Sequence, residues 1–213
     1  HIGIDRSRCY KNFKELCSKE KKRKDGIQVV AIMTPPNSHQ EIAEFFIKNN
    51  IHVISDKPFA ANLTQAKKLY KAIVSNKKVI YGLTHNYSGY PMVRYAKKLV
   101  KDGKLGTLEY INVEYLQDWS NGKKVNNKNA KKIFRWRLDK NIAGVSTVLN
   151  EIGSHAYHLC NYITELKGIS LLADIKQYSK KIKFDTSAQV FINYENGAKG
   201  LFWVSTTTKG GIY

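Results

Sequence analysis

Three short apolar runs separated by two amphipathic segments constrain the fold of this chain more than any other feature. The runs cover residues 27–33, 51–55 and 79–83, and their many β-branched residues are typical of strands. The segments between them, near 38–50 and 62–75, carry apolar residues at helical spacing. Strand, helix, strand, helix, strand at this spacing predicts a parallel sheet with crossover helices. We expect the first run to be buried on both of its faces.

The starts of the two helices carry recognisable capping residues. Ser38 is followed three residues later by Glu41, which predicts a capping box for the first helix. Asn62 or Thr64 is expected to cap the second helix.

The pattern changes near residue 86, which divides the chain into a parallel α/β part and an antiparallel α+β part. Residues 108–116 alternate between apolar and polar, which predicts a half-exposed antiparallel strand. A helix is expected from about 151 to 164. Further strands are expected near residues 169–178, 187–194 and 198–206. The dipeptide Asn196-Gly197 joins the last two strands and predicts a hairpin.

The ends of the parallel strands are the expected ligand site of the first part, because ligands of such sheets bind beyond the carboxyl ends of the strands. Segments 34–37, 56–58 and 84–87 lie at those ends. Lys57 follows a buried strand directly, and Pro58 keeps it out of the helical region. This placement suggests a catalytic lysine, although a strand-end lysine that only reaches solvent is the common case.

A polar stripe runs along the expected helix at 151–164. It contains Glu151, His155, His158 and Tyr162, which lie on one face. A carboxylate one turn from a histidine can orient the imidazole ring, so His155 is a candidate general base. Spacing alone favours the simpler alternative, a solvent-facing stripe with a helical pair. We expect no metal site built from Glu151, His155 and His158, since one helix cannot easily aim all three side chains at one ion.

Composition restricts the possible partners of the chain. The net charge of +19 invites a nucleic-acid role, but lysines are spread over the whole chain and arginine is scarce, which argues against nucleic-acid binding. No run approaches the roughly 18 apolar residues of a membrane span, and no leader is visible. Three cysteines without a paired spacing suit a reducing compartment, so we expect a cytoplasmic protein.

Three motifs in order resemble the Gfo/Idh/MocA family of NAD(P)-dependent sugar and polyol oxidoreductases. They are Thr34-Pro35-Pro36-Asn37-Ser38-His39, Asp56-Lys57-Pro58 and Glu151-Ile152-Gly153-Ser154-His155. The segment from His85 to Arg94 and the pair Trp136-Arg137 resemble one branch of the same family.

The resemblance implies a fold and a set of site residues. Residues 1–86 would form a partial Rossmann dinucleotide-binding domain. Residues 87–213 would form an α+β domain with an open, mostly antiparallel sheet, which binds substrate and mediates oligomerisation. Lys57, His155 and Glu151 would be catalytic, and the Lys57–Pro58 bond is often cis in relatives. The residues implied for binding NAD or NADP are Thr34, Pro35, Pro36, His39, Asp56, Lys57, Pro58, Asn86, Trp136 and Arg137.

The resemblance also implies an activity, which is hydride transfer from a sugar, polyol or related CH–OH substrate with Lys57 and His155 as proton relay. A homodimer or homotetramer through the open sheet is the implied assembly. Two features depart from the family pattern. Glu151 replaces an aspartate, and the chain contains no G-x-G-x-x-G phosphate loop. We therefore expect a fragment of an enzyme, or alternatively a truncated, inactive member with a binding or structural role.

Overall fold

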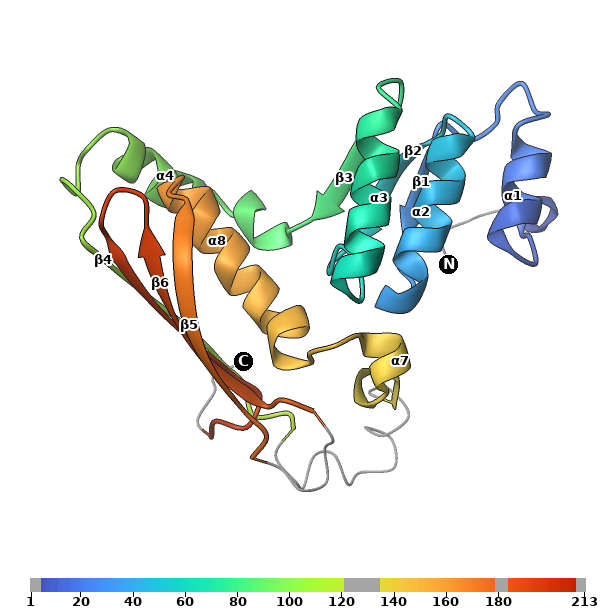
Figure 1. The fold of residues 1–213 in the computed structure, drawn as a ribbon. Coiled ribbons are helices and arrows are strands. Elements are labelled where there is room, and N and C mark those ends of the chain that lie inside the picture. Colours follow the sequence, from blue (N-terminus) through green and yellow to red (C-terminus); the bar gives the residue numbers. More distant parts are fainter. Residues whose placement is uncertain (1–4, 121–134, 179–183, 210–213) are drawn as a thin grey trace. The chain divides into compact units, whose positions relative to one another are not determined.

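The computed structural model describes residues 5–120, 135–178 and 184–209 (Figure 1). The chain forms two compact units, His1–Thr84 and His85–Tyr213. Each unit has its own hydrophobic core. Within the described ranges, no helix is both long and apolar enough to cross a membrane.

The first unit contains the predicted parallel sheet. Its strands β1 (Val29–Ile32), β2 (His52–Asp56) and β3 (Tyr81–Thr84) lie in the order β1-β2-β3, and both neighbouring pairs are parallel. The crossover helices are α2 (His39–Lys48) and α3 (Leu63–Ser75), with α1 (Phe13–Glu20) preceding the sheet. The strand–helix alternation read from the sequence is therefore confirmed.

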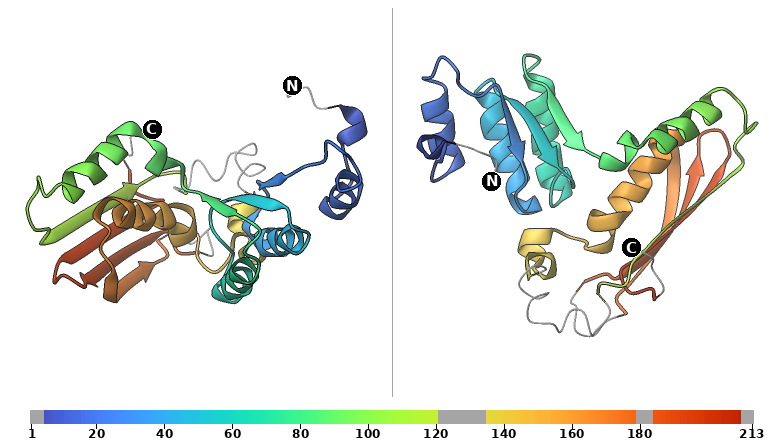
Figure 2. Two further views of the ribbon diagram at one scale, coloured as in Figure 1. Left: turned by 90° about the horizontal axis from the view of Figure 1, so that it is seen from above. Right: turned by 180° about the vertical axis from the view of Figure 1, so that it is seen from behind.

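Only one face of this sheet is covered by described helices. Figure 2 shows α2 and α3 on the same side of the strands. Val30, Ile32 and Val53 pack into the core with residues of these helices, whereas Val29 and Ile54 on the other face are exposed. The prediction that the run 27–33 is buried on both faces is wrong for the described part of the chain, because no described element covers the second face.

The two predicted helix caps had different outcomes. Asn62 caps α3, and its side-chain oxygen accepts a hydrogen bond from the Gln65 N–H at 2.9 Å, as expected. Ser38 precedes α2 but makes no capping bond. Its hydroxyl donates to the Pro35 carbonyl at 2.8 Å because a short 3-10 turn, Pro36–Ser38, leads into the helix.

The second unit combines a four-stranded sheet with helices. The sheet has the order β4-β7-β6-β5, and its strands are β4 (Tyr110–Leu116), β5 (Gly168–Lys176), β6 (Ser187–Tyr194) and β7 (Lys199–Ser205). The helices are α4 (Pro91–Lys101), α7 (Lys140–Ala143) and α8 (Ser154–Thr164), together with a π-helical turn, Leu149–Gly153, directly before α8. One face of the sheet packs against the turn and α8 through Val148, Ile152, Ala156 and Cys160.

The pairing of these strands corrects one prediction. Strands β5, β6 and β7 are antiparallel, and Gly197 at φ 88° closes the predicted hairpin between β6 and β7. However, β4 pairs with β7 in parallel, not antiparallel as expected. The alternation in residues 108–116 correctly predicted a half-buried strand. However, side-chain alternation carries no information about the direction in which a strand pairs.

Candidate functional site

The first group of predicted site residues lies at the carboxyl ends of β1, β2 and β3, and we call it the strand-end site. Asp56 joins two of these ends. Its Oδ1 accepts hydrogen bonds from the Lys57 backbone N–H at 2.8 Å and from the Thr84 hydroxyl at 2.9 Å. Because Asp56 pairs with Thr84 across parallel strands, its carboxylate fixes both chain segments as they leave the sheet.

Lys57 lies beside this carboxylate and is half-buried. The Lys57–Pro58 peptide bond is cis, as the resemblance implied. Pro58 itself is buried, so the chain turns into the protein directly after the lysine.

The segment after β1 completes the strand-end site. Thr34 and Pro35 are exposed, whereas Pro36 is buried in the 3-10 turn. His39 is only 1% exposed. Its Nδ1 lies 2.9 Å from the Pro58 carbonyl oxygen, and its Nε2 lies 2.6 Å from the Thr34 carbonyl oxygen. The predicted ligand residues Thr34, His39 and Pro58 are thus brought together by the fold.

The exposed groups at this edge suit a dinucleotide. The Thr34 hydroxyl and the Asp56 carboxylate are exposed at neighbouring strand ends. Hydroxyl and carboxylate oxygens can bind ribose hydroxyls or a carboxamide, and the edge lies where parallel sheets place their ligands. The residues present at this edge therefore fit polar groups of a dinucleotide cofactor.

The second group of predicted residues lies in the second unit around the start of α8, and we call it the helix site. Glu151 lies in the π-helical turn, and its Oε2 accepts a hydrogen bond from the Arg137 Nε at 3.0 Å. Both side chains are largely buried, with 26% exposure for Arg137 and 13% for Glu151. The Arg137 guanidinium also stacks over the Trp136 ring, 4.7 Å from its centroid. Arg137 thus contacts two other predicted site residues, Glu151 and Trp136.

His155 follows one turn after Glu151 and is 8% exposed. Its ring packs against Tyr87, with centroids 4.7 Å apart, and meets the edge of His85 at 5.9 Å. The alternative of a solvent-facing stripe is therefore wrong at His155. The segment around the 3-10 turn Asn86–Gly89 covers this face, while Asn86 itself stays exposed.

A stacked column of side chains extends the helix site along α8. The rings of His85 and His158 are parallel, with centroids 3.7 Å apart and planes 6° from each other. Tyr162 stacks beyond His158, and the Lys97 ammonium lies 4.4 Å from the Tyr162 ring centroid. Burial lowers the pKa of His158 below its ordinary value. The i, i+4 and i+7 spacing on the helix indicated the stripe, but nothing local indicated His85 as its partner.

Asp185 is a structural residue of the helix site that sequence reasoning missed. Its Oδ2 accepts from the Ser146 hydroxyl at 2.5 Å and from the Val148 N–H at 3.1 Å, and its Oδ1 accepts from the Thr147 N–H at 2.9 Å. It therefore holds the segment from which the π-helical turn begins. The partners lie 37 to 39 residues away in sequence, so no local pattern marks them.

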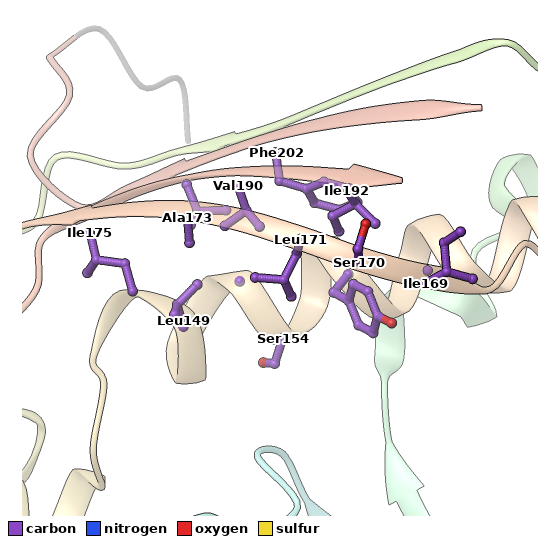
Figure 3. Close-up of a pocket in the computed structure, with 14 residues that line it drawn as sticks. Leu149, Ser154, Ile169, Ser170, Leu171, Ala173, Ile175, Val190, Ile192 and Phe202 are labelled. Atoms are coloured by element: carbon purple, nitrogen blue, oxygen red, sulfur yellow. The ribbon is translucent and has the colours of Figure 1, made fainter. Parts of the chain in front are cut away.

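An apolar groove of about 700 Å³ lies between β5 and the start of α8 (Figure 3). Leu149, Leu171 and Ile175 line it together with Ser154. Pockets that bind polar substrates carry converging polar groups. Because this groove is lined mainly by apolar side chains, and neither Glu151 nor His155 lines it, we do not assign the substrate to it. Among the described residues, no cluster of three His, Cys, Asp or Glu side chains could hold a metal ion.

Comparison with known proteins identifies the family. The model of an oxidoreductase family with an NAD-binding Rossmann fold matches residues 2–85, and the model of the GFO/IDH/MocA C-terminal domain matches residues 93–212. The chain belongs to the GFO/IDH/MocA family. Family members are NAD(P)-dependent oxidoreductases, so the resemblance read from the three motifs is confirmed, as is the Rossmann fold of the first part.

Relatives in this family cover nearly all of the chain. The uncharacterized oxidoreductase YfiI of Bacillus subtilis is 31% identical over 99% of the chain and 53% of its own length. Levoglucosan dehydrogenase of Pseudarthrobacter phenanthrenivorans is 34% identical over 64% of the chain and 33% of its own length. An inositol dehydrogenase homologue from Azotobacter vinelandii, solved with NAD+, superimposes with a TM-score of 0.91 at 28% identity, covering 99% of the chain and 54% of its own. The chain thus spans about half the length of YfiI and of this homologue.

Proposed function

We propose that the chain carries the catalytic lysine and histidine of an NAD(P)-dependent oxidoreductase that acts on a sugar or polyol. The observation that supports this most is the Asp56-Lys57-Pro58 segment at the ligand-binding edge of a Rossmann sheet, with its lysine held between an anchored carboxylate and a buried proline. Family membership supplies the redox class.

The proposed reaction is the oxidation of one CH–OH group to a carbonyl. A bound NAD or NADP would supply the acceptor for the hydride that leaves the substrate carbon. His155 takes the proton from the hydroxyl oxygen, which leaves a C=O group and a protonated imidazole. The burial of His155 among Tyr87 and His85 supports this role, because a base shielded from bulk water keeps its proton transfer directed at the substrate.

Lys57 would stabilise the oxygen that loses this proton. An ammonium close to a hydroxyl favours its deprotonated form and would lower the pKa of the substrate alcohol. The hydrogen bond from the Lys57 N–H to Asp56 supports the role, since it fixes the backbone from which the ammonium projects. We propose that Lys57 and His155 together form the relay for this proton.

Glu151 would act on the helix site mainly through its contacts. Its ion pair with Arg137 holds the π-helical turn that precedes His155. Trp136 and Arg137 would then approach the cofactor or substrate as one stacked unit. Thr34, Pro35, Asp56, Lys57 and Asn86 would meet the NAD or NADP cofactor directly. Pro36, His39 and Pro58 are buried, so they would contribute through the backbone that they position.

The substrate class rests on relatives. The Azotobacter homologue has been crystallised with NADH and myo-inositol, and levoglucosan dehydrogenase with NADH and levoglucosan. Both are polyhydroxylated rings, and we propose the same class here. The three free cysteines support a reducing location such as the cytoplasm.

A turnover assay with matched lysine variants tests the proposal. NADH or NADPH formation would be followed with a panel of cyclic polyols and anhydrosugars. Lys57→Ala should lower kcat by roughly 100-fold or more, while the exposed Lys67→Ala on α3 should behave as wild type. Equal activity of both variants would show that Lys57 has no catalytic role. Absence of any cofactor binding in a fluorescence titration would favour the inactive, structural alternative.

We further propose that the open face of the second sheet binds a second copy of the chain. Leu172, Phe191 and Leu201 form one cross-strand row there, and Leu172 and Phe191 are 71% and 57% exposed. Such an apolar row with polar neighbours suits a symmetric dimer, whose interface uses one patch twice. Sedimentation should show a dimer or tetramer that Leu172→Lys converts to monomer, whereas an unchanged mass would exclude this face.

A further inference from the structure

His39 makes two contacts that a neutral histidine cannot satisfy together. The ring is 1% exposed at the start of α2. Nδ1 lies 2.9 Å from the carbonyl oxygen of Pro58, and Nε2 lies 2.6 Å from the carbonyl oxygen of Thr34. Both distances are in the hydrogen-bonding range, and both partners are backbone carbonyls.

A carbonyl oxygen only accepts hydrogen bonds, so each contact requires a hydrogen on the ring nitrogen. Neutral imidazole carries one N–H and one lone pair, whereas imidazolium carries two N–H groups. In a neutral ring, one lone pair would face a carbonyl oxygen at 2.9 Å or less. We propose that His39 is protonated on both ring nitrogens and clamps the two strand-end segments on either side of it.

Two effects oppose this charge and two favour it. Burial disfavours the charged form, and the N-terminus of α2 carries partial positive charge. The two hydrogen bonds favour the charged form, because bonds donated by a cation are stronger and shorter than neutral ones. The Nε2 contact is short in this way. The neutral ring has no compensating arrangement at these positions, because it must replace one bond by a repulsive contact in a site with almost no exposure to solvent. The two acceptors are therefore the observation on which the proposal rests.

The clamp bears on Lys57, a consequence that rests on the proposed function. Pro58 directly follows Lys57, and its carbonyl is tied to His39. On the other side, the Lys57 N–H is tied to Asp56, which is tied to Thr84. The backbone on both sides of Lys57 is thus fixed, from β1 through the imidazolium and from β3 through the carboxylate. His39 is a positioning residue for Lys57.

A second histidine in the same unit provides an internal reference. The Nδ1 of His52, on β2, accepts a hydrogen bond from the Ile80 N–H at 3.0 Å. An accepting nitrogen carries no hydrogen, so this contact leaves only Nε2 of His52 to carry one. The two rings should therefore differ in protonation within one sample.

Nitrogen-15 NMR of the protein labelled at histidine tests this directly at pH 7. We expect two protonated-type ring nitrogens for His39, and one protonated and one unprotonated nitrogen for His52. One unprotonated nitrogen at His39 would overturn the inference. This measurement needs neither cofactor nor substrate, so it is independent of whether the proposed activity is correct.

Variants test the positioning role. His39→Phe keeps a ring but removes both donors, and His52→Phe removes one acceptor outside the site. We expect His39→Phe to lower kcat by roughly 10- to 100-fold, as displaced catalytic groups do, with His52→Phe near wild type. His39→Gln, which retains one donor group, should recover part of the loss. Equal kcat in both phenylalanine variants would overturn the positioning role. A wild-type chain without any turnover would overturn the proposed function, and the NMR result would still stand or fall separately.

Discussion

The strand-end site and the helix site are held in place by different kinds of contact. At the strand-end site, the bonds run largely to the backbone, as with His39 to two carbonyls and Asp56 to the Lys57 N–H. At the helix site, many contacts join two side chains, as in the Arg137–Glu151 ion pair and the His85–His158 stack, although Asp185 also binds backbone N–H groups there. Backbone partners persist whatever residue supplies them, whereas side-chain partners disappear with one substitution. The helix site should therefore respond more readily to mutation of residues that do no chemistry.

The largest expected effect separates two neighbouring histidines of the helix site. His155→Phe keeps ring packing against Tyr87 but removes the proposed base, so kcat should fall by about 100-fold or more. His158→Phe keeps the stack on His85 and should stay within about fivefold of wild type, because no proton transfer is assigned to it. Steady-state reduction of NAD+ or NADP+ measures both. A larger loss of kcat for His158→Phe would show that His155 is not the general base.

The sequence predicts the first unit well because its determinants are local. Apolar runs, helix spacing and strand-end polar residues all act over a few residues, and they located the parallel sheet and the ends of its strands. The predicted burial of the run 27–33 was too high. An apolar strand sequence indicates that both faces can be covered, but it does not show which element covers each face.

The helix site was only partly predictable. The spacing from Glu151 to Tyr162 gave the stripe, and the family motifs gave Trp136 and Arg137, but neither gave the contacts. His85, Asp185 and Tyr115 reach this region from distant segments, with the Tyr115 hydroxyl 2.7 Å from that of Tyr87. The parallel pairing of β4 was missed for a similar reason, because it depends on β7, far along the chain.

The Arg137–Glu151 pair should be the most sensitive side-chain contact that does no chemistry itself. Arg137→Met deprives a largely buried carboxylate of this partner, and we expect a loss of about 1–3 kcal/mol in the free energy of unfolding. Lys48→Met breaks an exposed helical pair with Glu44, where Lys48 is 69% exposed, and should cost about 0.3–0.5 kcal/mol. Urea unfolding of both variants, with a double-mutant cycle through Glu151→Gln, measures the difference. Similar losses in the two variants would show that burial does not strengthen the helix-site pair.

Asp185 should show a smaller effect that depends on the number of acceptors. Asp185→Asn keeps one acceptor oxygen and loses the other, which takes one or two of the three bonds to residues 146–148, so we expect a loss of about 1–2 kcal/mol. Asp139→Asn is the matched control, since the Asp139 side chain accepts from the Asn141 N–H through one oxygen, which asparagine keeps. Thermal unfolding should leave this control within about 0.5 kcal/mol of wild type. A control as unstable as Asp185→Asn would mean that charge at the helix start matters more than the number of bonds.

The smallest effect concerns pH and the stacked column. Burial lowers the pKa of His158 from its ordinary value of 6.5, so the unfolded chain binds this proton more readily than the folded chain. The contribution of His158 to stability is therefore complete above pH 6.5 and is lost as the pH falls below that value. Among the described residues, the charged and titratable neighbours of the column include His85, His155, Lys97 and Glu165, and they stay in place in His158→Phe. Wild type should thus lose more stability than His158→Phe between pH 8 and pH 5 in urea unfolding, because the variant cannot take up this proton. Parallel pH curves would show that His158 is accessible enough to be protonated equally in both states, and that the helix site is less shielded than its packing indicates.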